Sequence, residues 1–80
     1  MEYEYTTEGA DYPEEAVAFN STWSLELKQF IAEDAGKDFY DNDPNPEDFP
    51  IKLTIYGNGK NIGTFEVFLE PVFFSVAVGE

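Results

Sequence analysis

The spacing of hydrophobic and polar residues changes near Pro50, and this change predicts two structurally different parts. After Pro50, apolar residues occupy every second position in 51–55 and again in 65–69, which is the spacing of strands with one buried face. The glycine-rich stretch 57–60 between them tolerates positive φ and predicts a β-hairpin. The almost wholly apolar run 72–78 predicts a third strand.

Before Pro50, apolar residues recur at three- and four-residue intervals, which predicts a helix over 24–35 that Ser24 caps. Gly36 is expected to end or kink this helix. The apolar stripe expected to face the core consists of Leu27, Phe30, Ile31, Ala35 and Phe39.

Two shorter elements are expected nearer the N-terminus. Charged and aromatic residues alternate over 2–7, which predicts a short edge strand. A helix over 13–20 follows, because the Asp11 carboxylate can accept free amide hydrogens of a first turn and Pro13 is tolerated there. The predicted fold class is α+β, with one or two N-terminal helices packed on a C-terminal three-stranded antiparallel sheet.

Length and composition predict a single domain over residues 1–80. A hydrophobic content of 42% and an aromatic content of 18% supply one small core. Residues 1–48 form the acidic, largely helical part of this prediction, and residues 49–80 form the sheet. No run approaches the ~20 apolar residues of a membrane span, and the chain does not open with a basic stretch and an apolar run. We therefore expect a cytoplasmic protein with no membrane association. The sequence leaves the oligomeric state open, with a monomer favoured.

The residue types for most enzyme chemistry are absent, since the sequence contains no His, Cys or Arg. The common general base, the thiol nucleophile and the guanidinium phosphate clamp are therefore excluded. Carboxylate pairs such as Glu14/Glu15 and Glu33/Asp34 would need a substrate groove that 80 residues scarcely provide. We expect neither an enzyme nor a bound cofactor.

The loop that begins at Asp41 starts like a calcium-binding EF-hand loop, with the order Asp-Asn-Asp-Pro-Asn. The match ends there, because the sixth position holds Pro46 where Gly is required and the twelfth holds Lys52 where a bidentate Glu is required. Turn chemistry accounts for the Asp and Asn residues, so no metal site is expected.

Negative charge is concentrated in the first part of the chain. Residues 1–48 hold 14 of the 17 acids and a net charge of −12, whereas residues 49–80 hold −1. Such a field repels nucleic acid and anionic membranes, so we expect no direct nucleic-acid binding and a basic protein surface as the partner.

Several of these acids are spaced to form a row of phosphate substitutes. Asp34, Asp38 and Asp41 follow one another at four- and three-residue intervals, which aligns them on one helix face if the helix continues past Gly36. The alternative is an ordinary solubility face or an adaptation to high salt. The candidate partner-binding acids are Glu33, Asp34, Asp38, Asp41, Asp43, Glu47 and Asp48.

In size, charge and layout the whole chain resembles the small acidic phage-encoded anti-CRISPR proteins and other DNA mimics, although no diagnostic motif carries this resemblance. The resemblance implies an inhibitor in the cytoplasm of a host cell. It would block the basic surface with which a type I CRISPR surveillance complex reads the short motif beside its DNA target. Two other classes fit the same features. One is an antitoxin or immunity protein that plugs a basic nuclease or toxin, and the other is an acidic accessory protein without a mimic role.

Overall fold

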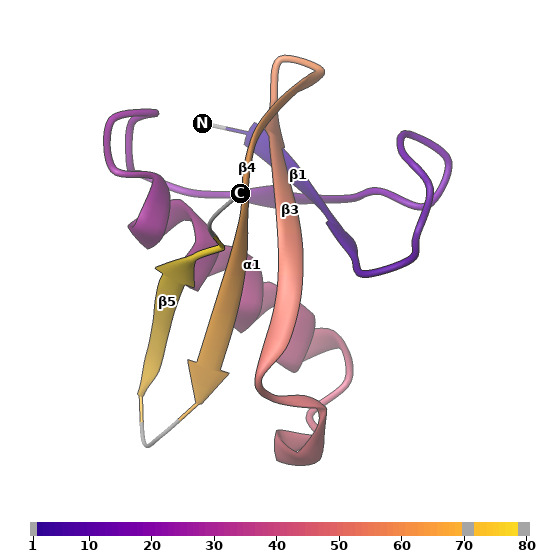
Figure 1. The fold of residues 1–80 in the computed structure, drawn as a ribbon, viewed down its shortest axis with the longest axis vertical. Coiled ribbons are helices and arrows are strands. Elements are labelled where there is room, and N and C mark those ends of the chain that lie inside the picture. The colour runs from indigo at the N-terminus through magenta and orange to yellow at the C-terminus, as the bar shows by residue number, and fades with distance from the viewer. Residues whose placement is uncertain (1, 70–71, 79–80) are drawn as a thin grey trace.

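Five antiparallel strands form one sheet, and a 15-residue helix crosses one of its faces (Figure 1). The computed structural model describes residues 2–69 and 72–78. The strands lie in the order β2-β1-β3-β4-β5, so β2 and β5 are the two edges. The elements are β1 (Glu2–Thr7), β2 (Val17–Asn20), α1 (Lys28–Asn42), the 3-10 helix η1 (Pro46–Asp48), β3 (Ile51–Gly57), β4 (Lys60–Leu69) and β5 (Phe73–Ala77).

The core lies between α1 and one face of the sheet. Side chains alternate between the two faces of a strand, so every second residue can point at the helix. Ile31, Ala32 and Ala35 of α1 are completely buried against this face. The buried residues of the sheet are Tyr3, Tyr5, Phe19, Leu53, Ile55, Phe65 and Val67.

The face of the sheet opposite α1 carries the loop that joins β1 to β2. Tyr12 of this loop stacks on Tyr56, with 3.7 Å between the ring centroids, and its hydroxyl donates to Glu4 at 2.8 Å. This hydrogen bond is the main cause that raises the pKa of Tyr12 above its ordinary value. Tyr12 therefore holds this loop on the face of the sheet away from α1.

The predicted architecture is wrong, because residues 2–20 add two strands to the sheet. The three predicted C-terminal strands are present as β3, β4 and β5. Residues 2–7 also form a strand, but β1 pairs with both β2 and β3 and so lies inside the sheet and not at its edge. The buried aromatic rings of Tyr3 and Tyr5 explain this position, since an inner strand covers large side chains better than an edge strand does.

The predicted helix over 13–20 is a turn followed by β2. Asp11 and Glu15 close the turn, because the Glu15 amide donates to the Asp11 carbonyl at 2.8 Å and the Asp11 amide donates to the Glu15 carboxylate at 3.0 Å. Phe19 then pairs with Tyr3 across the strands and is buried. The first half of the chain is therefore not largely helical, and local capping signals were overridden by burial of one aromatic side chain.

The main helix starts and ends later than the sequence predicts. Residues 24–27 form a turn in which the Leu27 amide donates to the Ser24 carbonyl at 2.9 Å, and Ser24 does not cap α1. Gly36 neither ends nor kinks the helix. A Cβ atom at Gly36 would lie 2.6 Å from Cγ1 of buried Val67, so glycine lets the helix approach β4 closely. The helix therefore continues to Asn42 and includes Asp34, Asp38 and Asp41.

Candidate functional site

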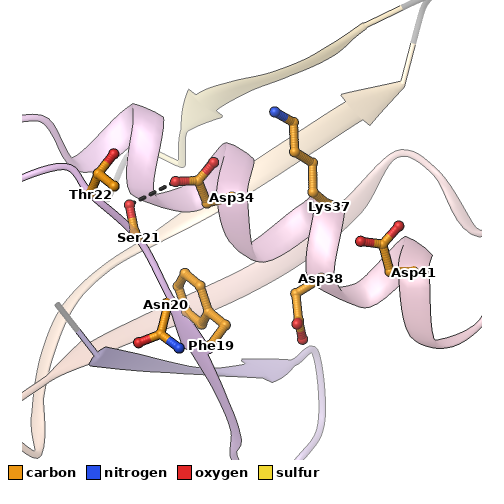
Figure 2. Close-up of a pocket in the computed structure, with 8 residues that line it drawn as sticks. All are labelled: Phe19, Asn20, Ser21, Thr22, Asp34, Lys37, Asp38 and Asp41. Carbon is orange, nitrogen blue, oxygen red and sulfur yellow. Dashed lines mark hydrogen bonds between the residues drawn. The ribbon is translucent and has the colours of Figure 1, made fainter.

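An open groove of about 480 Å³ lies between the end of β2 and the middle of α1 (Figure 2). Three carboxylates and one lysine of the helix form one wall, and residues 19–22 form the other. The helical repeat places the carboxylates of Asp34, Asp38 and Asp41 on this side of α1, as their spacing predicted. The lining residues are Phe19, Asn20, Ser21, Thr22, Asp34, Lys37, Asp38 and Asp41.

Asp34 is fixed by a buried hydroxyl. Ser21 donates from Oγ to Oδ2 of Asp34 at 2.7 Å, and Figure 2 shows the two groups pointing at each other. The same Oγ accepts the Trp23 amide hydrogen at 3.2 Å. Asp34 is half-buried, and this hydrogen bond holds its carboxylate in one position in the groove.

Asp38 is fixed by two donors. The Tyr5 hydroxyl donates to Oδ2 of Asp38 at 3.1 Å, and Nδ2 of Asn42 donates to the same oxygen at 3.2 Å. Burial, the Asp38 charge and this hydrogen bond raise the pKa of Tyr5 far above its ordinary value. Tyr5 therefore remains a proton donor at physiological pH, and Asp38 presents only part of its carboxylate to the groove.

Asp41 is exposed and completes the row at the C-terminal end of the helix. Lys37 lies between these acids in sequence, but Figure 2 shows its side chain extending away from Asp38. The groove consequently has two anchored carboxylates and one free carboxylate along its helical wall. This arrangement suits a cationic side chain, which gains charge-assisted hydrogen bonds from such oxygens.

Asp43, Glu47 and Asp48 are exposed in the segment after α1. Asp43 is the C-cap residue of the helix, and Glu47 and Asp48 belong to η1. The Asn45 side chain accepts the Glu47 amide hydrogen at 3.1 Å and so fixes the start of η1. These three acids extend the negative surface beyond the groove but do not line it.

Glu33 does not line the groove either. It is half-buried, and the Ser75 backbone of β5 donates a hydrogen bond to it. Burial raises the pKa of Glu33 above its ordinary value, and the Asp34 charge adds to this, whereas the Ser75 hydrogen bond and the Lys37 charge act in the opposite direction. Glu33 thus covers the edge strand, where a charged side chain discourages unwanted strand pairing.

Sequence reasoning missed the groove wall opposite the helix. The sequence predicts only a helix over 13–20 just before Ser21 and a short edge strand over 2–7 that contains Tyr5. Neither residue carries a local signal for its partner, because 13 positions separate Ser21 from Asp34 and 33 separate Tyr5 from Asp38. Both contacts depend on where β1 and β2 lie in the sheet.

Metal and membrane sites were also sought in the described residues. Within residues 2–69 and 72–78, no group of three or more acidic side chains is placed to hold a metal ion. None of the helices in this part of the chain is long and apolar enough to cross a membrane.

Comparison with known proteins adds no further assignment. No family model, no curated protein and no solved structure matches this chain.

Proposed function

We propose that this protein is a non-enzymatic inhibitor that occupies a basic, nucleic-acid-binding surface of a partner protein. Its carboxylates take the place of phosphates. The observation that carries the proposal is the position of Asp41 and Asp43 at the C-terminal end of α1, together with the groove acids beside them.

These positions are unfavourable for the helix itself. The C-terminal end of a helix carries a partial negative charge, and an acid there costs about 0.3–1 kcal/mol compared with a favourable charge. The first turn of α1 has no acidic residue and its last turn has no basic residue. A helix arranged for stability would have acidic residues in its first turn and basic residues in its last turn. Solubility does not require acids at this particular end, since they would serve equally well elsewhere on the surface.

The groove provides a chemical reason for this arrangement. Asp34 and Asp38 are held by donors from the residue just after β2, from β1 and from α1, so a partner does not have to order them on binding. Lys or Arg side chains that normally contact phosphates can donate charge-assisted hydrogen bonds to these oxygens. Asp41 and the acids after the helix then extend the contact along the partner.

The resemblance in size and charge to anti-CRISPR proteins suggests the partner class, which is the DNA-binding surface of a type I CRISPR surveillance complex. That surface reads the motif beside the target through basic residues and is sensitive to an anionic competitor. The proposal requires that the protein itself does not bind DNA or RNA, as a net charge of −13 implies.

A mobility-shift assay with such a complex and its labelled target duplex tests this function. Increasing amounts of the protein should release the duplex, and a higher concentration of the labelled duplex should reverse the release because the two compete for one surface. Unchanged DNA binding, or release that added target does not reverse, would reject the proposal for this partner class. Repeating the assay with a basic nuclease distinguishes the antitoxin alternative, which expects inhibition only of the nuclease.

A further inference from the structure

We propose that residues 23–30 form the apolar anchor of the same interface, an inference that rests on the proposed function. The partner would be a cationic protein surface that presents an apolar side chain flanked by arginines. The arginines would reach the groove acids, and the apolar side chain would pack against residues 23–30.

Four large apolar side chains of this segment are exposed. Trp23, Leu25, Leu27 and Phe30 expose 39%, 40%, 41% and 39% of their surfaces, and we call this set the apolar platform. A contiguous exposed apolar patch on a small protein is typical of an interaction site, and tryptophan is enriched among the residues that dominate binding energy.

The platform is held in place before any partner binds. The Trp23 amide donates to Ser21, and the Trp23 carbonyl accepts the Tyr3 hydroxyl at 2.9 Å. The indole ring stacks on Phe30 with 4.7 Å between centroids and 30° between the planes. A fixed aromatic side chain loses little conformational entropy on binding, which favours its use as an anchor.

The platform and the acidic groove are directly connected. Ser21 bonds to both Trp23 and Asp34, and Thr22 lines the groove immediately before Trp23. On the other side of the platform, Leu27 and Phe30 line a second pocket of about 400 Å³ with Phe65, Ala77 and Val78 among its other walls. The platform therefore adjoins both a hollow for a side chain and the groove that carries the row of carboxylates.

Charge complementarity identifies the occupant. A second copy of this chain also has a net charge of −13 and would bring its own acids toward the groove. Self-association is therefore disfavoured at this surface. Nucleic acid is repelled for the same reason. A cationic protein surface satisfies both features, since its charges meet the acids and its apolar side chain covers the platform.

Two synthetic peptides serve as probes. One alternates arginine and leucine, and the other has the same length and charge with serine in place of leucine. The protein has one tryptophan, so Trp23 fluorescence reports directly on the platform. The wild type should bind the leucine peptide about tenfold or more tightly than the serine peptide, with a shift of Trp23 emission to shorter wavelength.

Phe30→Ala and Phe74→Ala form a matched pair. Both residues expose 39%, and each stacks on another aromatic ring, but Phe74 stacks on Phe68 at 4.9 Å in the β4–β5 pair. Phe30→Ala should remove most of the preference for leucine, and Phe74→Ala should retain it. If circular dichroism shows that Phe30→Ala does not fold, Leu27→Ser replaces it with the same expectation.

The outcomes separate this inference from the proposed function. Equal affinity for both peptides, with salt-sensitive binding and unchanged Trp23 emission, overturns the anchor and leaves the acidic interface standing. An equal loss of preference in both alanine variants also overturns the anchor. Failure of both peptides to bind at low salt overturns the proposed function and this inference together.

Discussion

The hydroxyl of Ser21 donates to the carboxylate of Asp34 at 2.7 Å and thereby ties the chain just after β2 to the middle of α1. Oγ of Ser21 also accepts the Trp23 amide hydrogen. Ser21 therefore fixes one end of the groove and the start of the apolar platform together. Ser21 is almost completely buried, so water cannot readily replace it in this role.

Ser21→Ala should lower the free energy of unfolding by about 1.5–3 kcal/mol, because it removes a hydrogen bond to a charged and half-buried group. Urea denaturation of the variant and the wild type measures this loss. Asp34→Asn is the control and should cost less, since its amide oxygen still accepts the Ser21 hydroxyl. A loss within about 0.5 kcal/mol for Ser21→Ala would show that the contact contributes little to stability.

Gly36→Ala should destabilise the protein although alanine favours helices by about 1 kcal/mol. The added methyl group would lie 2.6 Å from Cγ1 of Val67, and overpacking of this kind costs about 1–3 kcal/mol. Thermal or urea unfolding tests the sign. The double variant with Val67→Ala should be more stable than the sum of the two single losses predicts, because the smaller side chain removes the clash. A stabilised Gly36→Ala variant would contradict the close approach of α1 to β4.

Asp43→Lys should raise the free energy of unfolding by about 0.3–1 kcal/mol, because it places a positive charge at the negative end of α1. The gain should shrink as salt screens the interaction. Binding to the basic partner should weaken in the same variant. Asp43→Asn is the matched control and should give a smaller change in both quantities. Loss of stability in Asp43→Lys would remove the dipole argument for the proposed function.

Glu33→Gln should stabilise the protein near neutral pH. Burial raises the pKa of Glu33 above 4.5, so the folded state binds its proton more readily than the unfolded state does. At neutral pH the carboxylate is ionised in both states and its burial lowers stability, whereas below both pKa values this penalty is absent. The gain from Glu33→Gln should therefore decrease toward zero as pH falls through the raised pKa and then through 4.5. Urea unfolding at neutral and acid pH measures it, and Glu8→Gln at an exposed loop position is the control.

The parts of the fold with strong local patterns could be predicted from the sequence, and those that depend on distant contacts could not. The hairpin of β3 and β4 follows from two-residue alternation around Asn58, whose φ is positive. The strand β2 has only four residues and is stabilised by burying Phe19 between Tyr3 and Tyr5, a contact that no local window contains. The continuation of α1 through Gly36 likewise depends on Val67.

The candidate site shows the same division. Helical spacing was sufficient to align Asp34, Asp38 and Asp41 once the helix continued past Gly36. It could not show that Asp34 and Asp38 have internal donors, so reversing all three acids cannot be expected to leave stability unchanged. A charge-reversal experiment should therefore use the exposed acids.

The most direct test of the acidic interface compares two triple lysine variants of equal net charge. The first replaces Asp41, Asp43 and Glu47, and the second replaces Glu8, Asp11 and Glu14 in the β1–β2 loop; all six residues are exposed. Each variant and the wild type are titrated into a type I surveillance complex at low and high salt, after circular dichroism confirms folding. The first variant should lose affinity by orders of magnitude and show a flatter salt dependence, because each lost charge-assisted contact contributes about 1.5–3 kcal/mol. The second should retain most of the wild-type affinity. Equal losses in the two variants, or binding by the wild type without salt dependence, would contradict the claim that the acids at the end of α1 form the binding surface.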